Sequence, residues 1–330
     1  MVETPTVLDS SDPSGIATAA QALCDGRLVA FPTETVYGLG ADATNAEAVA
    51  RVFHAKQRPA FDPLIVHIAD KAAVDAVVTS VPVPAARLMD AFWPGPLTLV
   101  LPKRAVIPDL VTAGLPGVGI RIPQHPVALE LLRSVRFPVA APSANPFGGI
   151  SPTTARHVAE GLGANVDCIL DGGPCAVGLE STVISFMTGM PVLLRPGGCP
   201  IEEIESLVGP VTRVVCNPDE DDSAQPAPGM LSRHYAPSTK LTLVARDKTA
   251  IAAAKQRSGL LTYGSQPCKG HFERIEWLGP TDDLRTCAAA FFAALRSLDS
   301  CALDVIIAHE FPDQGLGLAL NDRLRRAACR

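Results

Sequence analysis

The sequence has none of the features that would place a protein in a membrane or hold it together with disulfides or zinc. Its longest apolar runs, such as LTLVL at 97–101, are far shorter than the roughly 20 residues of a membrane-spanning helix. The 9 cysteines are odd in number and form no CxxC pair, which argues against a disulfide framework or a structural zinc site. The polar start of the chain lacks the order of a signal peptide. We therefore expect a cytoplasmic protein with no metal site of its own and no membrane partner.

The common catalytic and nucleotide-binding signatures are missing as well. There is no glycine-rich loop ending in Gly-Lys-Ser/Thr, no HExxH helix and no GxSxG elbow. The letters GLGADA at 38–43 fit a dinucleotide fingerprint, but PTETVY separates them from the strand that they would have to follow directly. The spacing therefore disfavours a nicotinamide site.

Cations are scarce in the first part of the chain. Residues 1–212 hold 13 Lys and Arg against 20 Asp and Glu, and the remainder holds 15 against 14. Neither part resembles the basic surface with which proteins bind nucleic acid. A non-catalytic RNA-binding module, one alternative function, is therefore disfavoured, and the position of each cation in the first part becomes informative.

The length of 330 residues predicts two domains, and the pattern divides near residue 212. Residues 1–212 alternate amphipathic helices with short apolar strands, which is typical of a mixed α/β domain. Thr44 and Glu47 predict a capping box, and Ser151 with Pro152 predicts the start of a helix that ends at Gly163. The expected strands are RLVAF, PLIVHI, LTLVLP, GVGIRIP, PVAAPS, CILDGG, STVISF and PVLLRP.

Residues 213–237 have no apolar period and are first acidic, then rich in proline, which predicts a linker. Residues 238–330 predict a small βαβ domain. Its expected order is the strand LTLVA, a polar helix, the strand GLLTY, a helix capped by Thr281, the strand VIIAHEF and a last helix.

Polar side chains gather where the strands and helices of the first domain end. Each of them alone has an ordinary structural explanation, such as an arginine on an edge strand or a satisfied buried histidine. Together they indicate a site for a polyanion and a small polar molecule, because ligands bind at strand ends of open α/β sheets and arginine suits phosphate or carboxylate. These residues are Thr33, Thr35, Lys56, Arg58, His67, Arg121, Ser143, Asn145, Ser151, Glu180, Ser181, Thr182 and Arg195.

Several of these segments follow one another in a characteristic order. FPTETVYGLG, Lys56-x-Arg58 before PLIVHI, WPGPLTLVL, IRIP, PSANPFGGISPT, DGG with GLESTV, and LLRPG resemble the threonylcarbamoyl-AMP synthase family. PGMLSRHYAP and GLGLALNDRLRRAA resemble the linker and the last helix of its longer members. The resemblance implies a large, open, twisted, YrdC-like α/β domain with a cationic cavity, a linker, and a small Rossmann-like α/β domain.

The resemblance also implies a reaction. A nucleotidyltransferase of this family combines L-threonine, bicarbonate or CO2, and ATP, which carries Mg2+, and it releases pyrophosphate and threonylcarbamoyl-AMP. The product passes to the tRNA threonylcarbamoyl transferase machinery, and little direct tRNA binding is expected. A carbamoyl-transfer enzyme that shares the domain is a further alternative, but it would be expected to carry cysteine pairs and additional domains.

The site follows from the same resemblance, position by position. The four signature residues, which face ATP and carry the catalysis, are Lys56, Arg58, Ser143 and Asn145. Further nucleotide positions are Asp62, Gly117, Ser151, Arg195, His234 and Tyr235, and the threonine positions are Thr33, Thr35, His67, Arg121, Ala141 and Ser181. Asp62 and Gly117 depart from the Asn or Ser and the Thr expected there, and an acidic Asp62 would repel phosphates. Whether His67 acts as a base or only orients the substrate stays open.

Overall fold

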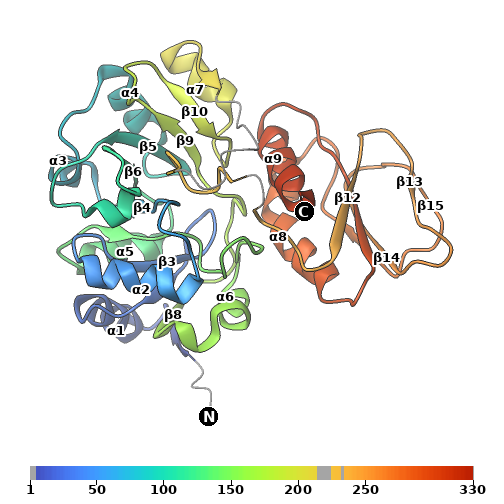
Figure 1. Cartoon of the computed structure of the whole chain (residues 1–330), viewed down its shortest axis with the longest axis horizontal. Coiled ribbons are helices and arrows are strands. Elements are labelled where there is room, and N and C mark those ends of the chain that lie inside the picture. The colour runs from blue at the N-terminus through green and yellow to red at the C-terminus, as the bar shows by residue number, and fades with distance from the viewer. Residues whose placement is uncertain (1–4, 214–223, 232–233, 330) are drawn as a thin grey trace.

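The computed structural model describes residues 5–213, 224–231 and 234–329 and arranges them around two large sheets and one two-stranded sheet (Figure 1). The described part of the first domain forms an 11-stranded sheet with the order β1-β8-β2-β3-β7-β4-β6-β5-β9-β10-β11. Parallel and antiparallel pairs both occur in it, so the expected mixed α/β fold is confirmed. Its strands are β1 (Thr6–Asp9), β2 (Val29–Phe31), β3 (Gly38–Asp42), β4 (Ile65–His67), β5 (Leu97–Pro102), β6 (Gly117–Arg121), β7 (Val139–Ala140), β8 (Cys168–Asp171), β9 (Thr182–Ser185), β10 (Val192–Arg195) and β11 (Thr212–Arg213).

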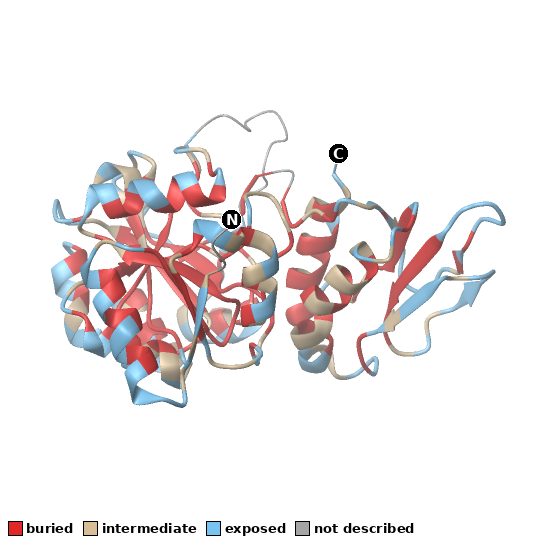
Figure 2. Ribbon diagram, turned by 90° about the horizontal axis from the view of Figure 1, so that it is seen from below, coloured by how far each residue is buried: buried red, intermediate tan, exposed pale blue. Residues whose placement is uncertain are grey.

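Helices cover both faces of this sheet and bury its apolar side chains (Figure 2). Ile16 and Leu131, from two helices that pack on each other, enclose Phe31 and Val139 on one face. A larger cluster around Leu99 forms on the other face. The helices are α1 (Pro13–Cys24), α2 (Ala46–Lys56), α3 (Val74–Val77), α4 (Val83–Phe92), α5 (Pro126–Ser134), α6 (Ala155–Leu162) and α7 (Ile201–Val208).

The small domain has a parallel sheet with the order β12-β17-β14-β16, formed by Lys240–Val244, Val305–His309, Ser258–Thr262 and Arg274–Trp277. Helices α8 (Leu284–Asp299) and α9 (Leu316–Ala328) lie between this sheet and the large domain (Figure 1). The strands are all parallel, and α8 connects β16 to β17, so the α/β part of the expectation is confirmed, although β12, β14 and β16 are not joined to one another through helices.

The polar helix expected after the first strand of the small domain is wrong. The structure has a short strand there, β13 (Ala250–Ile251), which pairs with β15 (Cys268–Lys269). Ala250 and Ala252 are buried while Ile251 between them is exposed. This period of two is the pattern of a strand, and the segment has no continuous face on which a helix could pack.

Two of the expected helix caps are displaced by one or two residues. Asn45, not Thr44, caps α2, and its side chain accepts hydrogen bonds from the backbone N–H groups of Glu47 and Ala48. The Thr44 hydroxyl instead donates to Asp42 at 2.7 Å, so it is not free to cap. Asp283, two residues after Thr281, caps α8. A carboxylate or amide oxygen serves this role as well as a hydroxyl, so the sequence alone does not choose between neighbours.

Helix α6 begins later than expected. Thr154 caps it, and Gly163 follows its last residue as predicted. The Ser151 hydroxyl donates to Glu180 at 2.5 Å instead of capping a helix. The serine therefore belongs to a polar network that a local pattern does not reveal.

Candidate functional site

A cavity opens at the strand ends of the large sheet, where the last described part of the linker meets it. Arg121 at the end of β6 and Ser143 in the loop after β7 line it from the large domain, and Pro228 and Gly229 line it from the linker. Twelve of the residues expected at the site line the cavity: Thr33, Thr35, Arg58, His67, Arg121, Ala141, Ser143, Glu180, Ser181, Arg195, His234 and Tyr235.

Arg121, the last residue of β6, is held on every side. Its Nε donates to the Gly95 carbonyl at 3.2 Å, and its Nη1 donates to the Thr35 hydroxyl at 2.9 Å. Its Nη2 lies 2.6 Å from a carboxylate oxygen of Glu34, and both side chains are buried. The sequence reasoning missed Glu34, although it stands between the two threonines of FPTETVYGLG. The guanidinium is therefore fixed in place, and a ligand carboxylate that bound to it would share it with Glu34.

The two threonine hydroxyls continue the chain of donors from Arg121. Thr33 donates to the Val36 carbonyl at 2.6 Å and lies 2.8 Å from the Thr35 hydroxyl. Since the Thr33 proton is used there, Thr35 donates to Thr33 and accepts from Arg121. The orientation of both hydroxyls is therefore set before a substrate arrives.

His67, the last residue of β4, is buried at the same end of the cavity. Burial, and then the positive charge of Arg121, lowers the pKa of His67 to about 3. The imidazole is therefore neutral at physiological pH, and its Nδ1 has no hydrogen-bond partner among the described residues. A base this weak takes a proton poorly, so the geometry favours a role in orienting a substrate.

Lys56 and Arg58 flank the end of α2, where Gln57 adopts a left-handed conformation with φ 53°. Lys56 is the last residue of the helix, not a residue beyond it. Its ammonium donates to the carbonyl of Ser143 at 2.6 Å and to that of Asn145. Lys56 therefore holds the loop that carries Ser143 and Asn145, and the side chain does not line the cavity as the structure stands.

Asp62 is completely buried against Arg58, with 2.9 Å between a carboxylate oxygen and the guanidinium Nη2. Burial raises the pKa of Asp62, while the charges of Arg58, Lys56 and Arg195 oppose that rise. Burial also lowers the pKa of Lys56, of Arg58 and of Arg195. Several cations are thus concentrated around one internal carboxylate, which is an environment that a polyanion would stabilise.

Three more of the expected nucleotide residues lie outside the lining of the cavity. Asn145 uses its amide to donate to the carbonyls of Pro146 and Gly149, both at 2.9 Å. Ser151 is not among the residues that line the cavity, and its hydroxyl donates a hydrogen bond to Glu180, which does line it. Gly117 begins β6, at the opposite end from Arg121, and a Cβ there would lie 2.9 Å from the Met187 sulfur. The packing of Met187 accounts for this glycine, and nothing places it beside the cavity.

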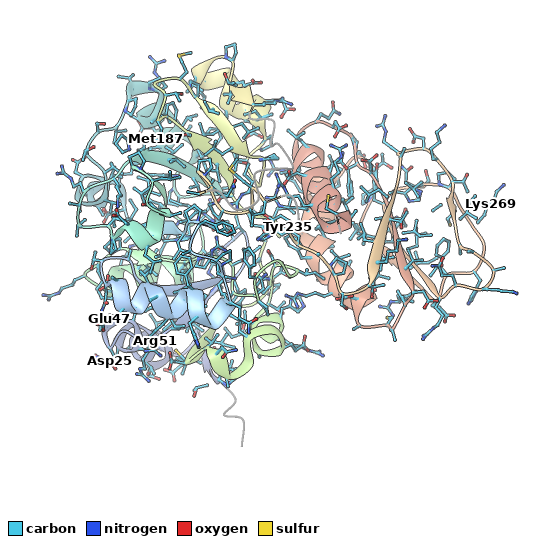
Figure 3. All side chains as sticks on the ribbon, viewed as in Figure 1. Asp25, Glu47, Arg51, Met187, Tyr235 and Lys269 are labelled. Carbon is cyan, nitrogen blue, oxygen red and sulfur yellow. The ribbon has the colours of Figure 1, made fainter. Side chains whose placement is uncertain are left out.

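The linker is anchored over the end of the cavity that Arg58 and Arg195 line, which the resemblance assigns to the nucleotide. Arg195 donates to the carbonyls of Ser181, at 3.0 Å, and of Pro228, at 2.8 Å. His234 and Tyr235 follow, and both are buried. Tyr235 lies at the junction of the two domains (Figure 3). Its hydroxyl and the Nδ1 of His234 have no hydrogen-bond partner among the described residues. Residues 214–223 and 232–233 of the expected linker lie outside the described residues.

Two properties of the described residues concern metals and membranes. No group of three or more His, Cys, Asp or Glu side chains in this part of the chain could hold a metal ion. None of its helices is both long and apolar enough to cross a membrane.

Comparisons with known proteins agree along the whole chain. Residues 21–197 match the family model described as "Telomere recombination", and residues 199–329 match the model described as "Threonylcarbamoyl-AMP synthase, C-terminal domain". The threonylcarbamoyl-AMP synthase of Pyrococcus abyssi is 44% identical over 95% of this chain and 94% of its own length, and that of Bacillus subtilis is 44% identical over 99% and 96%. The crystal structure of the P. abyssi protein complexed with L-threonine superposes with a TM-score of 0.88 at 40% identity, covering 99% of this chain and 98% of the other. The chain therefore belongs to the threonylcarbamoyl-AMP synthase family.

Proposed function

We propose that this protein is an L-threonylcarbamoyladenylate synthase, which makes threonylcarbamoyl-AMP and pyrophosphate from L-threonine, bicarbonate or CO2, and ATP. The observation that carries the proposal is the division of one cavity into two cationic ends. Arg121, fixed by Glu34 and Thr35, stands at one end, and Arg58 and Arg195 stand at the other. The first suits an amino-acid carboxylate and the second a polyphosphate.

The chemistry needs alignment of two anions more than it needs a nucleophilic side chain. The threonine amine adds to the carbon of CO2 and loses a proton, which gives a carbamate. A carbamate oxygen then attacks the α-phosphorus of ATP, and the bond to the β-phosphate breaks as pyrophosphate leaves. Both reactants are negative, so Arg58 and Arg195 would lower their repulsion and stabilise the charge that develops on the phosphates. Mg2+ enters with ATP as part of this substrate.

The remaining side chains would orient the reactants. Arg121 would bind the threonine carboxylate in a fork, and neutral His67 would accept or donate one hydrogen bond to the substrate. Lys56 would act through the Ser143–Asn145 loop, whose carbonyls accept hydrogen bonds from its ammonium group. No covalent intermediate with the protein is required.

Residues 213–237 would serve as a lid between a catalytic domain at 1–212 and a small domain at 238–330. Support comes from Pro228, whose carbonyl accepts a hydrogen bond from Arg195, and from Ala236, whose N–H donates to the Gly148 carbonyl at 2.8 Å. Both contacts lie beside the nucleotide end of the cavity, so ATP would have to displace or rearrange this segment on entry. A lid would also keep water from the activated product.

The product would pass in the cytoplasm to the tRNA threonylcarbamoyl transferase machinery, with little direct tRNA binding by this chain. The excess of acidic residues in the first 212 residues supports the second part of this proposal. The rival reading, an RNA-binding module, requires salt-dependent retention of tRNA, which a filter-binding titration would reveal.

Pyrophosphate release from ATP tests the proposed reaction. It should require both threonine and bicarbonate. Serine, which lacks one methyl group, should be the poorer substrate by about 1 kcal/mol in kcat/KM, the scale of one buried methyl group. Equal pyrophosphate release without any amino acid would contradict the proposal.

A further inference from the structure

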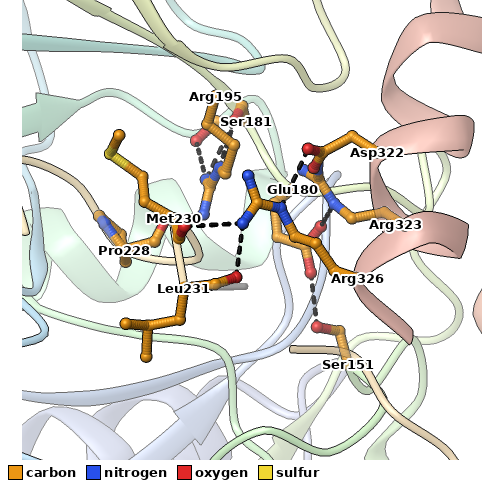
Figure 4. A network of polar contacts seen from close by, with 10 residues as sticks. All are labelled: Ser151, Glu180, Ser181, Arg195, Pro228, Met230, Leu231, Asp322, Arg323 and Arg326. Carbon is orange, nitrogen blue, oxygen red and sulfur yellow. Dashed lines mark hydrogen bonds and ion pairs between the residues drawn. The ribbon is translucent and has the colours of Figure 1, made fainter. Parts of the chain in front are cut away.

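Arg323 belongs to the small domain but is completely buried against the large one (Figure 4). It lies on α9, and its Nε donates to Glu180 of the large domain at 2.8 Å. Its Nη1 donates to the neighbouring Asp322 at 2.5 Å, and its guanidinium carbon lies 4.9 Å from the centre of the Tyr235 ring. A buried arginine is tolerated only when its charge is paired, so these contacts define its place closely.

Glu180 connects this arginine to the cavity. Its side chain is only 7% exposed and lines the cavity wall. One carboxylate oxygen accepts from Arg323, and the other accepts from the Ser151 hydroxyl at 2.5 Å. The next residue in the chain, Ser181, accepts hydrogen bonds from Arg195 at its carbonyl and at its hydroxyl. A negative charge therefore stands beside the cations that would bind phosphates.

That negative charge would oppose a polyphosphate unless something offsets it. Like charges that lie close together near a protein surface repel each other, so an unpaired Glu180 would weaken binding of a polyanion measurably. Within the described residues, Arg323 is the cation that forms an ion pair with Glu180, and it comes from the other domain.

Two further arginines of the small domain act on the same wall of the site. Arg326 donates to the linker carbonyls of Met230, at 2.7 Å, and Leu231, at 2.5 Å. Arg296 of α8 donates to the carbonyl of Ile150, immediately before Ser151. Docking of the small domain thus fixes the backbone around Ser151 and the linker as well as the Glu180 charge.

We infer that Arg323 is a positioning residue for the nucleotide end of the site, supplied by the small domain. It neutralises Glu180, fixes that carboxylate so that it orients the Ser151 hydroxyl, and supports Tyr235 of the linker. The inference rests on the proposed function to the extent that the cavity takes ATP. It gives the small domain a defined task in a reaction whose other proposed residues all lie in the large domain and the linker.

The test is the dissociation constant of ATP, measured by isothermal titration calorimetry on the full chain. Arg323→Gln should weaken ATP binding about tenfold or more, because it leaves Glu180 charged and unpaired beside the phosphates. Threonine binding, at the far end of the cavity, should change less than about twofold. In Arg323→Gln/Glu180→Gln the repulsive charge is gone, and ATP affinity should return to within about threefold of the native value. Arg325→Gln, on the same helix but half exposed, is the matched control.

A purely structural role predicts a different pattern. A folded Arg323→Gln protein with native ATP affinity would overturn the inference, and so would a double variant that binds ATP as weakly as the single one. If circular dichroism shows that Arg323→Gln does not fold, Arg323→Lys replaces it. That variant keeps a charge but loses the fork, so it should weaken ATP binding about threefold, and Glu180→Gln should reverse the loss; native affinity would again overturn the inference. Assaying the native protein for threonylcarbamoyl-AMP in parallel separates failure of this inference from failure of the proposed reaction.

Discussion

Replacing Asp62 by asparagine removes the negative charge from the centre of the cation cluster at the nucleotide end. This carboxylate lies 2.9 Å from Arg58, with both side chains at most 3% exposed. The phosphates of ATP must therefore compete with an internal anion for the same guanidinium. The native enzyme would lose part of its binding energy in breaking that pair.

The magnitude follows from the kind of contact that is exchanged. A hydrogen bond to a charged group contributes about 1.5–3 kcal/mol and one between neutral groups about 0.5–1.5 kcal/mol. Exchanging the carboxylate for an amide should therefore free about 1 kcal/mol or slightly more for ATP. In the absence of divalent cations, Asp62→Asn should bind ATP roughly fivefold to tenfold more tightly than the native protein.

Calorimetric titration of ATP in EDTA, and again with Mg2+, measures this effect. Asp90→Asn is a suitable control, because Asp90 is 76% exposed and pairs with Lys71 on the surface. Unchanged or weaker ATP binding by Asp62→Asn in EDTA would refute the idea that Asp62 competes with the phosphates of ATP for Arg58. Weaker binding only when Mg2+ is present would show instead that Asp62 contributes to the metal's environment in the loaded site.

Four further substitutions and one proteolysis experiment test other parts of the account. Lys56→Ala and Arg58→Ala should each lower kcat/KM by a factor that corresponds to about 2–4 kcal/mol of activation free energy. Arg58→Ala should also lower the urea concentration at the midpoint of unfolding, since it leaves buried Asp62 unpaired. Native steady-state kinetics in either folded variant would contradict the assignment of these residues to the nucleotide site. Arg121→Lys should raise the Michaelis constant for threonine and leave that for ATP unchanged, because lysine cannot form the fork. The pKa of His67 is about 3 in the folded protein, which is below its value of about 6.5 in the unfolded chain. As the pH falls below about 6.5, the unfolded chain therefore binds a proton that the folded protein does not, and the free energy of unfolding decreases. Between pH 7 and pH 5 the free energy of unfolding should therefore fall by about 2 kcal/mol more in the native protein than in His67→Gln, as measured by urea denaturation. ATP with threonine should protect the chain around Arg233 from limited trypsin digestion. Equal cleavage rates with and without both ligands would show that the linker only connects the two domains and does not act as a lid.

The sequence predicted the parts of the fold that local patterns determine. Alternating apolar residues, such as Val118 and Ile120, identified the strands because each strand buries one face or both. Helix starts were less certain, because Thr44 and Asn45 are both good caps and only the contact between Thr44 and Asp42 decides between them. Three strands of the large sheet, β1, β3 and β11, were not predicted, since β1 and β11 are mostly exposed and β3 contains two glycines.

The site was predictable as a set of segments but not as a set of contacts. Arg121 and Thr35 both stood out from the sequence, yet Glu34, which ion-pairs with Arg121, did not. The pair between Glu180 and Arg323 joins residues 143 positions apart, in different domains, and no local spacing encodes it. Asp62 appeared as a departure from the expected pattern, but only the structure shows that it is buried in an ion pair with Arg58, one of the cations proposed to bind phosphate.

Product analysis with labelled bicarbonate tests the central claim most directly. The full chain is incubated with ATP, Mg2+, L-threonine and 13C-bicarbonate, and the nucleotides are separated at once and analysed by mass spectrometry. The account predicts a species with the mass of threonylcarbamoyl-AMP that carries one 13C atom, appears together with pyrophosphate, and is absent when threonine is omitted. AMP and pyrophosphate formed at the same rate without any labelled adduct, or no ATP turnover at all by the folded protein, would contradict it.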